Sequence, residues 1–329
     1  MDRRAFIQAT ALSACAASGA RGDSVKPSSP AGGGNVFSSD GNRATIRTAA
    51  SVKPLRVFQL TDTHLAIRDG REDPFRQYSD RMAGGYRANR HFLTNETISA
   101  EEAFDRTLDL AMREKPDFLA LTGDILSFPS EAGVERVMEK LGETGIPFAY
   151  IAGNHDWHYE GMPGSSVELR ETWLEKRLEP FYQGNNPLFA SYDVNGVRFV
   201  AIDNSVYEVL PQQLEFFNVQ VASGMPLVLL IHIPLYIPGR PIGYGCGHPD
   251  WGPETDKDFK LERRPPWHAG GQTEATLAFH RAVFAAPNLL AILAGHTHRQ
   301  ALDVKNNIPQ WVGGHNATGF FTDLRIIPH

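Results

Sequence analysis

Five short apolar runs recur along the chain after residue 54, and each is followed directly by polar residues. The runs read LRVFQL, DFLAL, PFAYIA, PLVLLI and AILA. Between or after them lie segments with apolar residues at helical spacing, over residues 100–115, 130–144 and 273–286. Short buried strands that alternate with helices are typical of an α/β fold with covered sheets. The pattern therefore predicts an α/β domain over residues 51–329.

The polar residues that follow the five runs are aspartate, asparagine and histidine. In α/β folds, ligands bind beyond the carboxyl ends of the strands, where these residues are expected to lie. One such residue is commonly a cap or a turn residue, but five clusters together indicate a metal site. The clusters are Asp-x-His at 62–64, Gly-Asp at 123–124, Gly-Asn-His-Asp at 153–156, His232, and Gly-His-x-His at 295–298.

The last cluster places two imidazoles, His296 and His298, on either side of one residue. In an extended backbone, side chains at positions i and i+2 point to the same side, which suits a metal ion shared by both rings. A glycine precedes the polar residues in three of the five clusters. At these positions we expect the backbone to turn sharply or to approach another segment closely.

The overall composition narrows the chemistry. The chain has 329 residues and a formal net charge of -6, which argues against non-specific binding of nucleic acid. Its two cysteines, Cys15 and Cys246, exclude a disulfide framework and a thiolate zinc site. The twelve histidines are therefore the expected transition-metal ligands. Cys246 has no nearby partner that would activate it, so we expect it to be inert.

Residues 1–15 predict an export signal. Arg3, Arg4 and Phe6 precede a short apolar segment and resemble a twin-arginine signal. The segment is too short to span a bilayer. It ends in Leu-Ser-Ala-Cys, which resembles a lipobox whose acylated cysteine is Cys15; a disordered tail is the alternative. We expect residues 16–50, rich in Gly, Ser, Pro and Ala, to form a flexible linker. The protein would then be periplasmic or attached to the cell envelope, with membrane contact only through its N-terminal lipid.

The order of the five clusters resembles that of the calcineurin-like metallophosphoesterases, from about Leu55 to the C-terminus. The resemblance implies a four-layered α/β/β/α sandwich and two divalent metal ions, which could be Mn, Fe, Zn or Co. It places His296 and His298 on different ions, in place of the single shared ion considered above. The implied ligands are Asp62, His64 and His298 for the first ion, Asn154, His232 and His296 for the second, and Asp124 as the bridge.

The resemblance also implies hydrolysis of a phosphate ester by a hydroxide that bridges the two metals, without a side-chain nucleophile. His155 would contact the phosphate and protonate the leaving oxygen, although a packing role is the alternative. The serine/threonine phosphatases of the superfamily have an aspartate three residues after the bridging aspartate, and it orients this histidine. Ser127 occupies that position here, and Asp156 is a candidate substitute. Purple acid phosphatases have tyrosine there, so Ser127 argues against a ferric-tyrosinate enzyme.

Two segments extend beyond a minimal domain. Residues 68–90 are rich in arginine with acidic residues interspersed, which favours a solvated surface insertion, although Arg68 could contact a phosphate. Residues 236–271 form a long loop rich in glycine, proline and aromatic residues, and we expect it to border the pocket. Its candidate substrate contacts, each more commonly structural when taken singly, are Tyr244, His248, Trp251 and Trp267.

Other functions are less consistent with the pattern. Amidohydrolases carry an His-x-His pair on their first strand, whereas here that pair comes last. Metallo-β-lactamases need an His-x-His-x-Asp-His run, which this sequence lacks. A catalytically silent, metal-binding surface lipoprotein would be expected to lack a ligand or His155, yet all eight positions are present. We therefore expect an enzyme that acts on a small phosphate ester, either a monoester or a diester.

Overall fold

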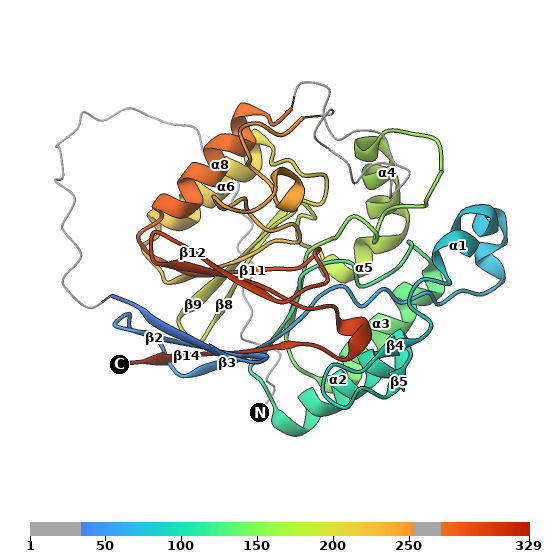
Figure 1. The fold of residues 1–329 in the computed structure, drawn as a ribbon, viewed down its shortest axis with the longest axis horizontal. Helices are drawn as coiled ribbons and strands as arrows, with labels where there is room; N and C mark the ends of the chain where they lie inside the picture. Colours follow the sequence, from blue (N-terminus) through green and yellow to red (C-terminus); the bar gives the residue numbers. More distant parts are fainter. Residues whose placement is uncertain (1–33, 253–270) are drawn as a thin grey trace.

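The computed structural model describes residues 34–252 and 271–329. The expected export signal at residues 1–15 and the candidate contact Trp267 lie outside these residues. Two six-stranded sheets pack face to face, and helices cover the outer face of each sheet (Figure 1). This arrangement confirms the predicted four-layered α/β/β/α sandwich.

Each sheet is built around parallel central strands. The first has the order β1 (Val36–Asp40), β2 (Arg43–Thr48), β14 (Thr322–Pro328), β3 (Leu55–Leu60), β6 (Phe118–Leu121) and β7 (Phe148–Tyr150). The second has the order β12 (Ala301–Lys305), β13 (Ile308–Val312), β11 (Leu289–Ala294), β10 (Leu227–Leu230), β9 (Val197–Ile202) and β8 (Phe189–Val194). Strands β3, β6 and β7 are parallel, as are β9, β10, β11 and β13, so their carboxyl ends share an edge in each sheet.

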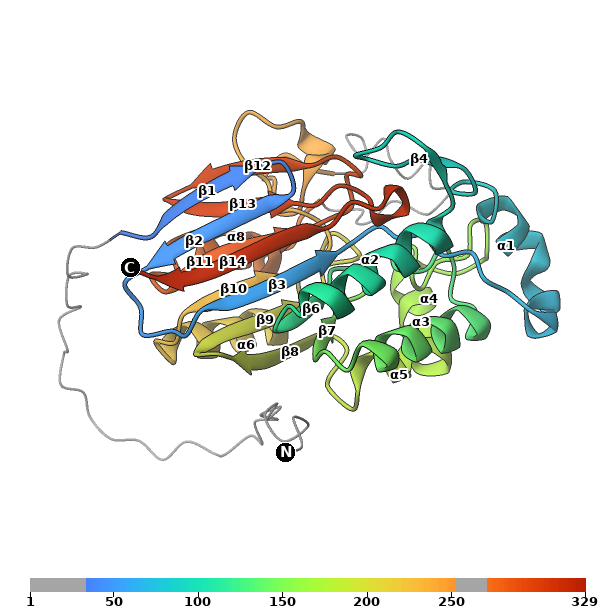
Figure 2. The same cartoon turned by 90° about the horizontal axis from the view of Figure 1, so that it is seen from below.

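The helices cover the outer faces of the sandwich. Figure 2 shows α2 and α3 in front of the first sheet and α6 and α8 behind the second. A two-stranded sheet, β4 (Asn89–Arg90) with β5 (Thr97–Ile98), lies outside the sandwich. The α-helices are α1 (Arg76–Met82), α2 (Ala100–Glu114), α3 (Glu131–Thr144), α4 (Ser166–Trp173), α5 (Glu179–Tyr182), α6 (Pro211–Ala222) and α8 (Glu274–Ala285). Shorter helical turns are η2 (Gly70–Phe75), η3 (Leu174–Leu178), η4 (Ile242–Tyr244) and η5 (Asn316–Thr318).

The three helices expected from apolar spacing are confirmed to within about one residue at each end as α2, α3 and α8. Each begins after a residue whose side-chain oxygen accepts a backbone N–H of the first turn, and these caps are Ser99, Ser130 and Thr273. Such capping satisfies a donor that has no partner inside the helix. The hydroxyl side chains therefore fix where these helices start.

Alternate residues of the central strands supply two different cores. In β3, Val57 belongs to the apolar cluster between the two sheets, whereas Phe58 packs with residues of the covering helices. In β10, Val228 belongs to the cluster between the sheets and Leu229 to the cluster under the helices. Successive side chains of a strand point to opposite faces, so a strand buried on both faces is apolar throughout. This explains why the five runs show no alternation of polar and apolar residues.

Residues 36–48 correct the predicted domain boundary. We expected them in a flexible linker, but they form the hairpin β1–β2 at the edge of the first sheet, beside β14 (Figure 2). Ala44 and Ile46 are buried, whereas Arg43 and Arg47 on the same strand are exposed, and the turn contains Gly41 at φ 55°. The composition of residues 16–50 as a whole hides this short alternating segment. The folded domain therefore begins before residue 51.

No helix is both long and apolar enough to cross a membrane in residues 34–252 and 271–329.

We predict that Ile46→Ala lowers the free energy of unfolding by about 2–5 kcal/mol, because it opens a cavity between the sheets. Arg47→Ala, on the exposed face of the same strand, is the control and should change it little. Urea unfolding followed by circular dichroism measures both. Equal, small effects of the two substitutions would show that the hairpin does not belong to the folded core.

Candidate metal centre

The carboxyl ends of the central strands bring six of the seven expected metal ligands together in two groups. In each group, one potential ligand atom per residue lies within 4.8 Å of the others. Asp124 belongs to both groups. The first group is Asp62, His64, Asp124 and His298, and the second is Asp124, His232 and His296.

The distances in the first group fit a single metal ion. Nε2 of His298 lies 3.3 Å from Oδ1 of Asp62 and 2.9 Å from Nε2 of His64. Nε2 of His64 lies 3.9 Å from Oδ2 of Asp124. Two ligand atoms that are each about 2.0–2.2 Å from one ion lie roughly 3–4 Å apart. The four side chains therefore surround a space of the right size for one ion.

In the second group, each histidine ring is oriented by a contact of one of its two nitrogens, which leaves the other nitrogen for a metal. Nδ1 of His232 lies 2.8 Å from the carbonyl oxygen of Thr122, so it carries the proton and donates. Its buried Nε2 has no hydrogen-bond partner and lies 3.3 Å from Oδ2 of Asp124. Nε2 of His296 contacts the hydroxyl of Tyr207, which leaves Nδ1 for a metal. Such outer contacts set the tautomer and the ring direction of metal-binding histidines.

Asn154, the remaining expected ligand, is 2% exposed, and its Oδ1 has no hydrogen-bond partner. A buried acceptor without a partner is rare in folded proteins because of its desolvation penalty. Coordination to a metal would satisfy this oxygen. The chemistry of Asn154 is therefore consistent with the ligand role that the resemblance implied.

The backbone is left-handed at most of these positions. Five candidate ligands have φ between 53° and 70°, a region that residues other than glycine seldom occupy. Residues His296 and His298 are among them, and β11 already ends at Ala294. The extended backbone expected at this pair is therefore wrong, and the two rings belong to different groups. The five residues are Asp62, His64, Asp124, His296 and His298.

Two glycines allow close approach to the carboxylates of the site. A Cβ on Gly153 would collide with Asp124, and a Cβ on Gly295 would collide with Thr61 and Asp62. The expectation of close backbone approach at the glycines before the polar residues is thus confirmed. The loops can pack this tightly only without side chains at these two positions.

Asp156 holds two backbone segments together, the loops after β6 and β7, instead of orienting His155. Its carboxylate accepts the N–H groups of Asp124 and Gly153 at 2.8 Å and of Leu126 at 2.7 Å. Burial raises the pKa of Asp156, and the negative charge of Asp124 raises it further. The role suggested for it from the sequence is therefore corrected.

Ser127 also acts on the backbone: its hydroxyl donates to the carbonyl oxygen of His64 at 2.9 Å. The half-buried ring of His155 stands edge-on to the His64 ring, with 4.8 Å between centroids. The backbone N–H of His155 donates to Oδ1 of Asp124 at 2.8 Å. His155 therefore lies beside the first group while its ring stays outside both groups.

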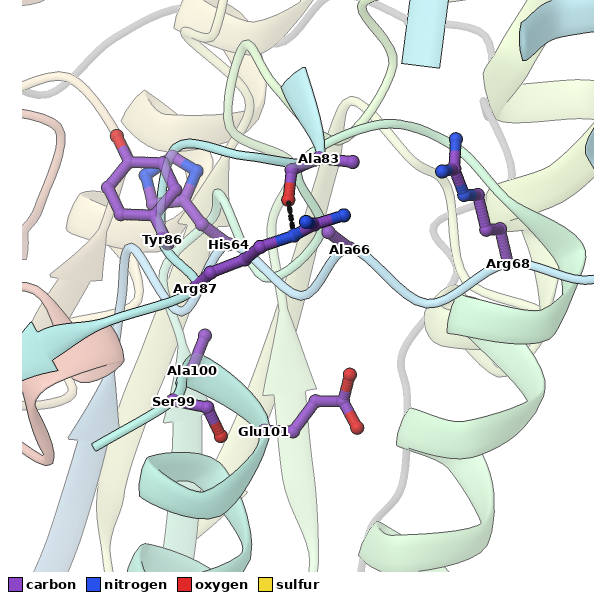
Figure 3. Close-up of a pocket in the computed structure, with 9 residues that line it drawn as sticks. All are labelled: His64, Ala66, Arg68, Ala83, Tyr86, Arg87, Ser99, Ala100 and Glu101. Atoms are coloured by element: carbon purple, nitrogen blue, oxygen red, sulfur yellow. Dashed lines mark hydrogen bonds between the residues drawn. The ribbon is translucent and has the colours of Figure 1, made fainter. Parts of the chain in front are cut away.

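The other candidate contacts lie farther out. Arg68 is ion-paired with Asp80 and lines a cavity beside His64 (Figure 3). The His248 ring packs on Tyr236, 4.0 Å between centroids, within its own loop. The Tyr244 hydroxyl donates to Asp303. Trp251 stacks on Tyr207 at 6.2 Å and so contacts the residue behind His296.

Two further aromatic side chains pack on ligand rings, and neither belongs to a recognisable sequence motif. Tyr86 stacks on His64 with ring centroids 4.1 Å apart and planes 9° apart. His315 stacks on His298 at 5.3 Å and 12°. Tyr86 belongs to the segment expected to be a solvated insertion, yet it is half-buried against the site. That segment is therefore partly a cover for the first group.

The electrostatics of the site favour cations. Burial raises the pKa of the Asp62 carboxyl, but the hydrogen bond and charge of His298 outweigh it and lower that pKa below its usual value. Burial opposes protonation of His232, yet Asp124 beside it raises its pKa to about 10. Burial raises the pKa of Asp124 as well, but the charges of His232 and His155 outweigh it and hold that pKa well below its usual value. Both carboxylates are thus ionised, and a metal that binds at His232 has to displace the proton that Asp124 stabilises there.

Known proteins share parts of this pattern. A probable cyclic nucleotide phosphodiesterase of Psychrobacter sp. (strain PRwf-1) is 24% identical over 208 residues, which are 60% of this chain and 52% of that protein. A probable cyclic nucleotide phosphodiesterase of Psychrobacter arcticus is 27% identical over 104 residues, 31% of each protein. The chain thus spans about half the length of the first of these relatives, and less of the second.

Among solved structures, a dimetal phosphatase from Danio rerio is 12% identical and aligns over 81% of this chain and 91% of that chain, with a TM-score of 0.49. A family model matches residues 55–300, a range that includes all five clusters. By that match, the chain belongs to the calcineurin-like phosphoesterase family, whose members are metal-dependent hydrolases.

Proposed function

We propose that this protein hydrolyses a small phosphate ester at a centre of two divalent metal ions. One observation carries the proposal: the carboxylate of Asp124 belongs to both groups of potential ligands. A shared carboxylate places negative charge between two cations that would otherwise repel each other. The family match supports the same chemistry.

The residues that would hold the ions provide nitrogen and oxygen donors and no thiolate. This set suits Mn, Fe, Zn or Co. When bound, a pair of such ions activates water for attack on phosphorus and neutralises charge on the phosphoryl oxygens. In this assignment Asp62, His64 and His298 hold the first ion, Asn154, His232 and His296 hold the second, and Asp124 bridges them.

His155 is the proposed general acid. Its ring lies against His64 but in neither ligand group, so its nitrogens are available to a substrate. A proton donated by this ring to the leaving oxygen avoids release of a strongly basic alkoxide. The hydrogen bond from the backbone N–H of His155 to Oδ1 of Asp124 fixes the backbone of His155 relative to the proposed bridge.

The substrate class is best approached through a panel of monoesters and diesters. Two relatives are named as probable cyclic nucleotide phosphodiesterases, so cyclic nucleotides belong in that panel beside aryl and glycerol diesters. Assays on protein reconstituted with each of the four metals would test the proposal. Absence of hydrolysis with every metal and every ester would reject it.

We also propose that the protein is exported and anchored by a lipid on Cys15. The support comes from the sequence alone, in which an Arg-Arg pair precedes a short apolar segment that ends in Leu-Ser-Ala-Cys. Such a lipid would keep the catalytic domain near the membrane surface.

Asp124→Asn should lower the bound metal from two ions to one or fewer and reduce kcat by at least roughly 100-fold, because the shared negative charge is lost. Metal analysis and kinetics on the same preparation measure both effects. Asp109→Asn, on the exposed face of α2, is the control. Two retained ions with near-normal turnover would contradict the bridging role.

His155→Ala should retain both metal ions and lose about 10²–10⁴-fold in kcat on alkyl esters, which need a proton at the leaving oxygen. The loss on nitrophenyl esters should be much smaller, because nitrophenolate leaves readily as an anion. An equal loss on both would assign His155 to positioning, and a lost ion would make it a ligand.

Cys15→Ser should abolish lipid attachment and change N-terminal processing in a bacterial host that exports the wild-type protein. Membrane fractionation and mass spectrometry of the N-terminus report these changes. Recovery of uncleaved wild type entirely in the soluble fraction would refute the anchor.

A further inference from the structure

A cavity of about 230 Å³ opens beside the first ligand group, between segments 64–68 and 83–87 and the start of α2 (Figure 3). Its lining includes His64, Tyr86, Arg68, Arg87 and Glu101. We propose that this cavity binds an anionic group, a carboxylate or a phosphate, carried by the leaving group of the substrate, and that Arg87 contacts it. The proposal rests on the proposed phosphoesterase function.

The cavity adjoins His64, whose ring contacts the proposed general acid His155. His155, the proposed donor to the leaving oxygen, stands edge-on to the ring of His64. His64 also lines the cavity, and Tyr86 covers the face of its ring. In the proposed arrangement, a leaving group whose oxygen is near His155 passes the edge of Tyr86, which lines the cavity together with His64.

Arg87 provides a positive charge there, and the carboxylate of Asp80, which is ion-paired with Arg68, interacts with it electrostatically. Nε of Arg87 donates to the carbonyl oxygen of Ala83 at 3.2 Å, which fixes the side chain across the cavity (Figure 3). Among the residues that the structure describes, no carboxylate forms an ion pair with it. Arg68, by contrast, is already paired with Asp80. An unpaired guanidinium that is held by its Nε still offers its terminal N–H groups to a carboxylate or a phosphate.

The remaining lining limits the kind of ligand. Glu101 adds a negative charge at the start of α2, so an anionic group is favoured only on the side of Arg87. At about 30 Å³ for each water molecule, the cavity has room for roughly eight waters. This volume suits a compact group with one anionic substituent.

The test compares two aryl esters that differ by one carboxylate, phenyl phosphate and 4-carboxyphenyl phosphate, or the corresponding diaryl diesters if the wild type prefers diesters. For Arg87→Ala, we expect KM for the carboxyphenyl ester to rise roughly tenfold or more relative to any change in KM for the phenyl ester. Arg87→Lys should recover part of this difference, because the charge remains but the planar fork is lost.

Two further variants are measured with the same pair of esters. Arg90→Ala removes an exposed arginine outside the cavity and should leave the ratio of the two KM values unchanged. Glu101→Gln removes the repelling charge and should not raise KM for the carboxyphenyl ester. A proportional change for both esters in Arg87→Ala would overturn the proposal while leaving the phosphoesterase function intact. Wild-type protein that hydrolyses neither ester class would overturn both.

Discussion

The site depends on the burial of the Asp124 carboxylate among loops from both sheets. Oδ1 accepts the N–H of His155, and Oδ2 faces Nε2 of His232 at 3.3 Å. Its own N–H is held by Asp156, which joins the loops after β6 and β7. An ionised carboxylate at such depth requires compensating charge. The imidazoles supply part of this positive charge. The carboxylate needs more than they provide, and this makes the position favourable for metal cations.

The same loops carry backbone strain. Left-handed φ angles at residues other than glycine cost on the order of 1 kcal/mol each, and five ligand positions share this conformation. The fold tolerates them because the surrounding segments determine the loops, for example through the N–H of His296, which donates to Asp62 at 2.9 Å. The surrounding segments thus set the backbone geometry of the ligand positions, and the packing of the two sheets maintains it.

The sequence predicted the elements whose signals are local. The strand ends and their polar clusters are read from adjacent residues, and helices α2, α3 and α8 from their apolar spacing. Contacts between distant segments could not be predicted, such as Tyr86 on His64 or His315 on His298, because nothing in either segment specifies the other. The hairpin β1–β2 was missed since its six-residue alternating strand lies in a stretch dominated by Gly, Ser and Pro. The hydrogen bonds from the N–H groups of Asp124 and Leu126 to Asp156 also join distant segments, so they could not be predicted either.

Each ligand group draws side chains from both sheets. The first takes Asp62, His64 and Asp124 from the ends of strands of the first sheet, and His298 from the second. The other joins the same Asp124 to His232 and His296 of the second sheet. Ions held there would link the two sheets at the edge where the parallel strands of both sheets end. Loading the centre would then stiffen the whole molecule against shear between its sheets.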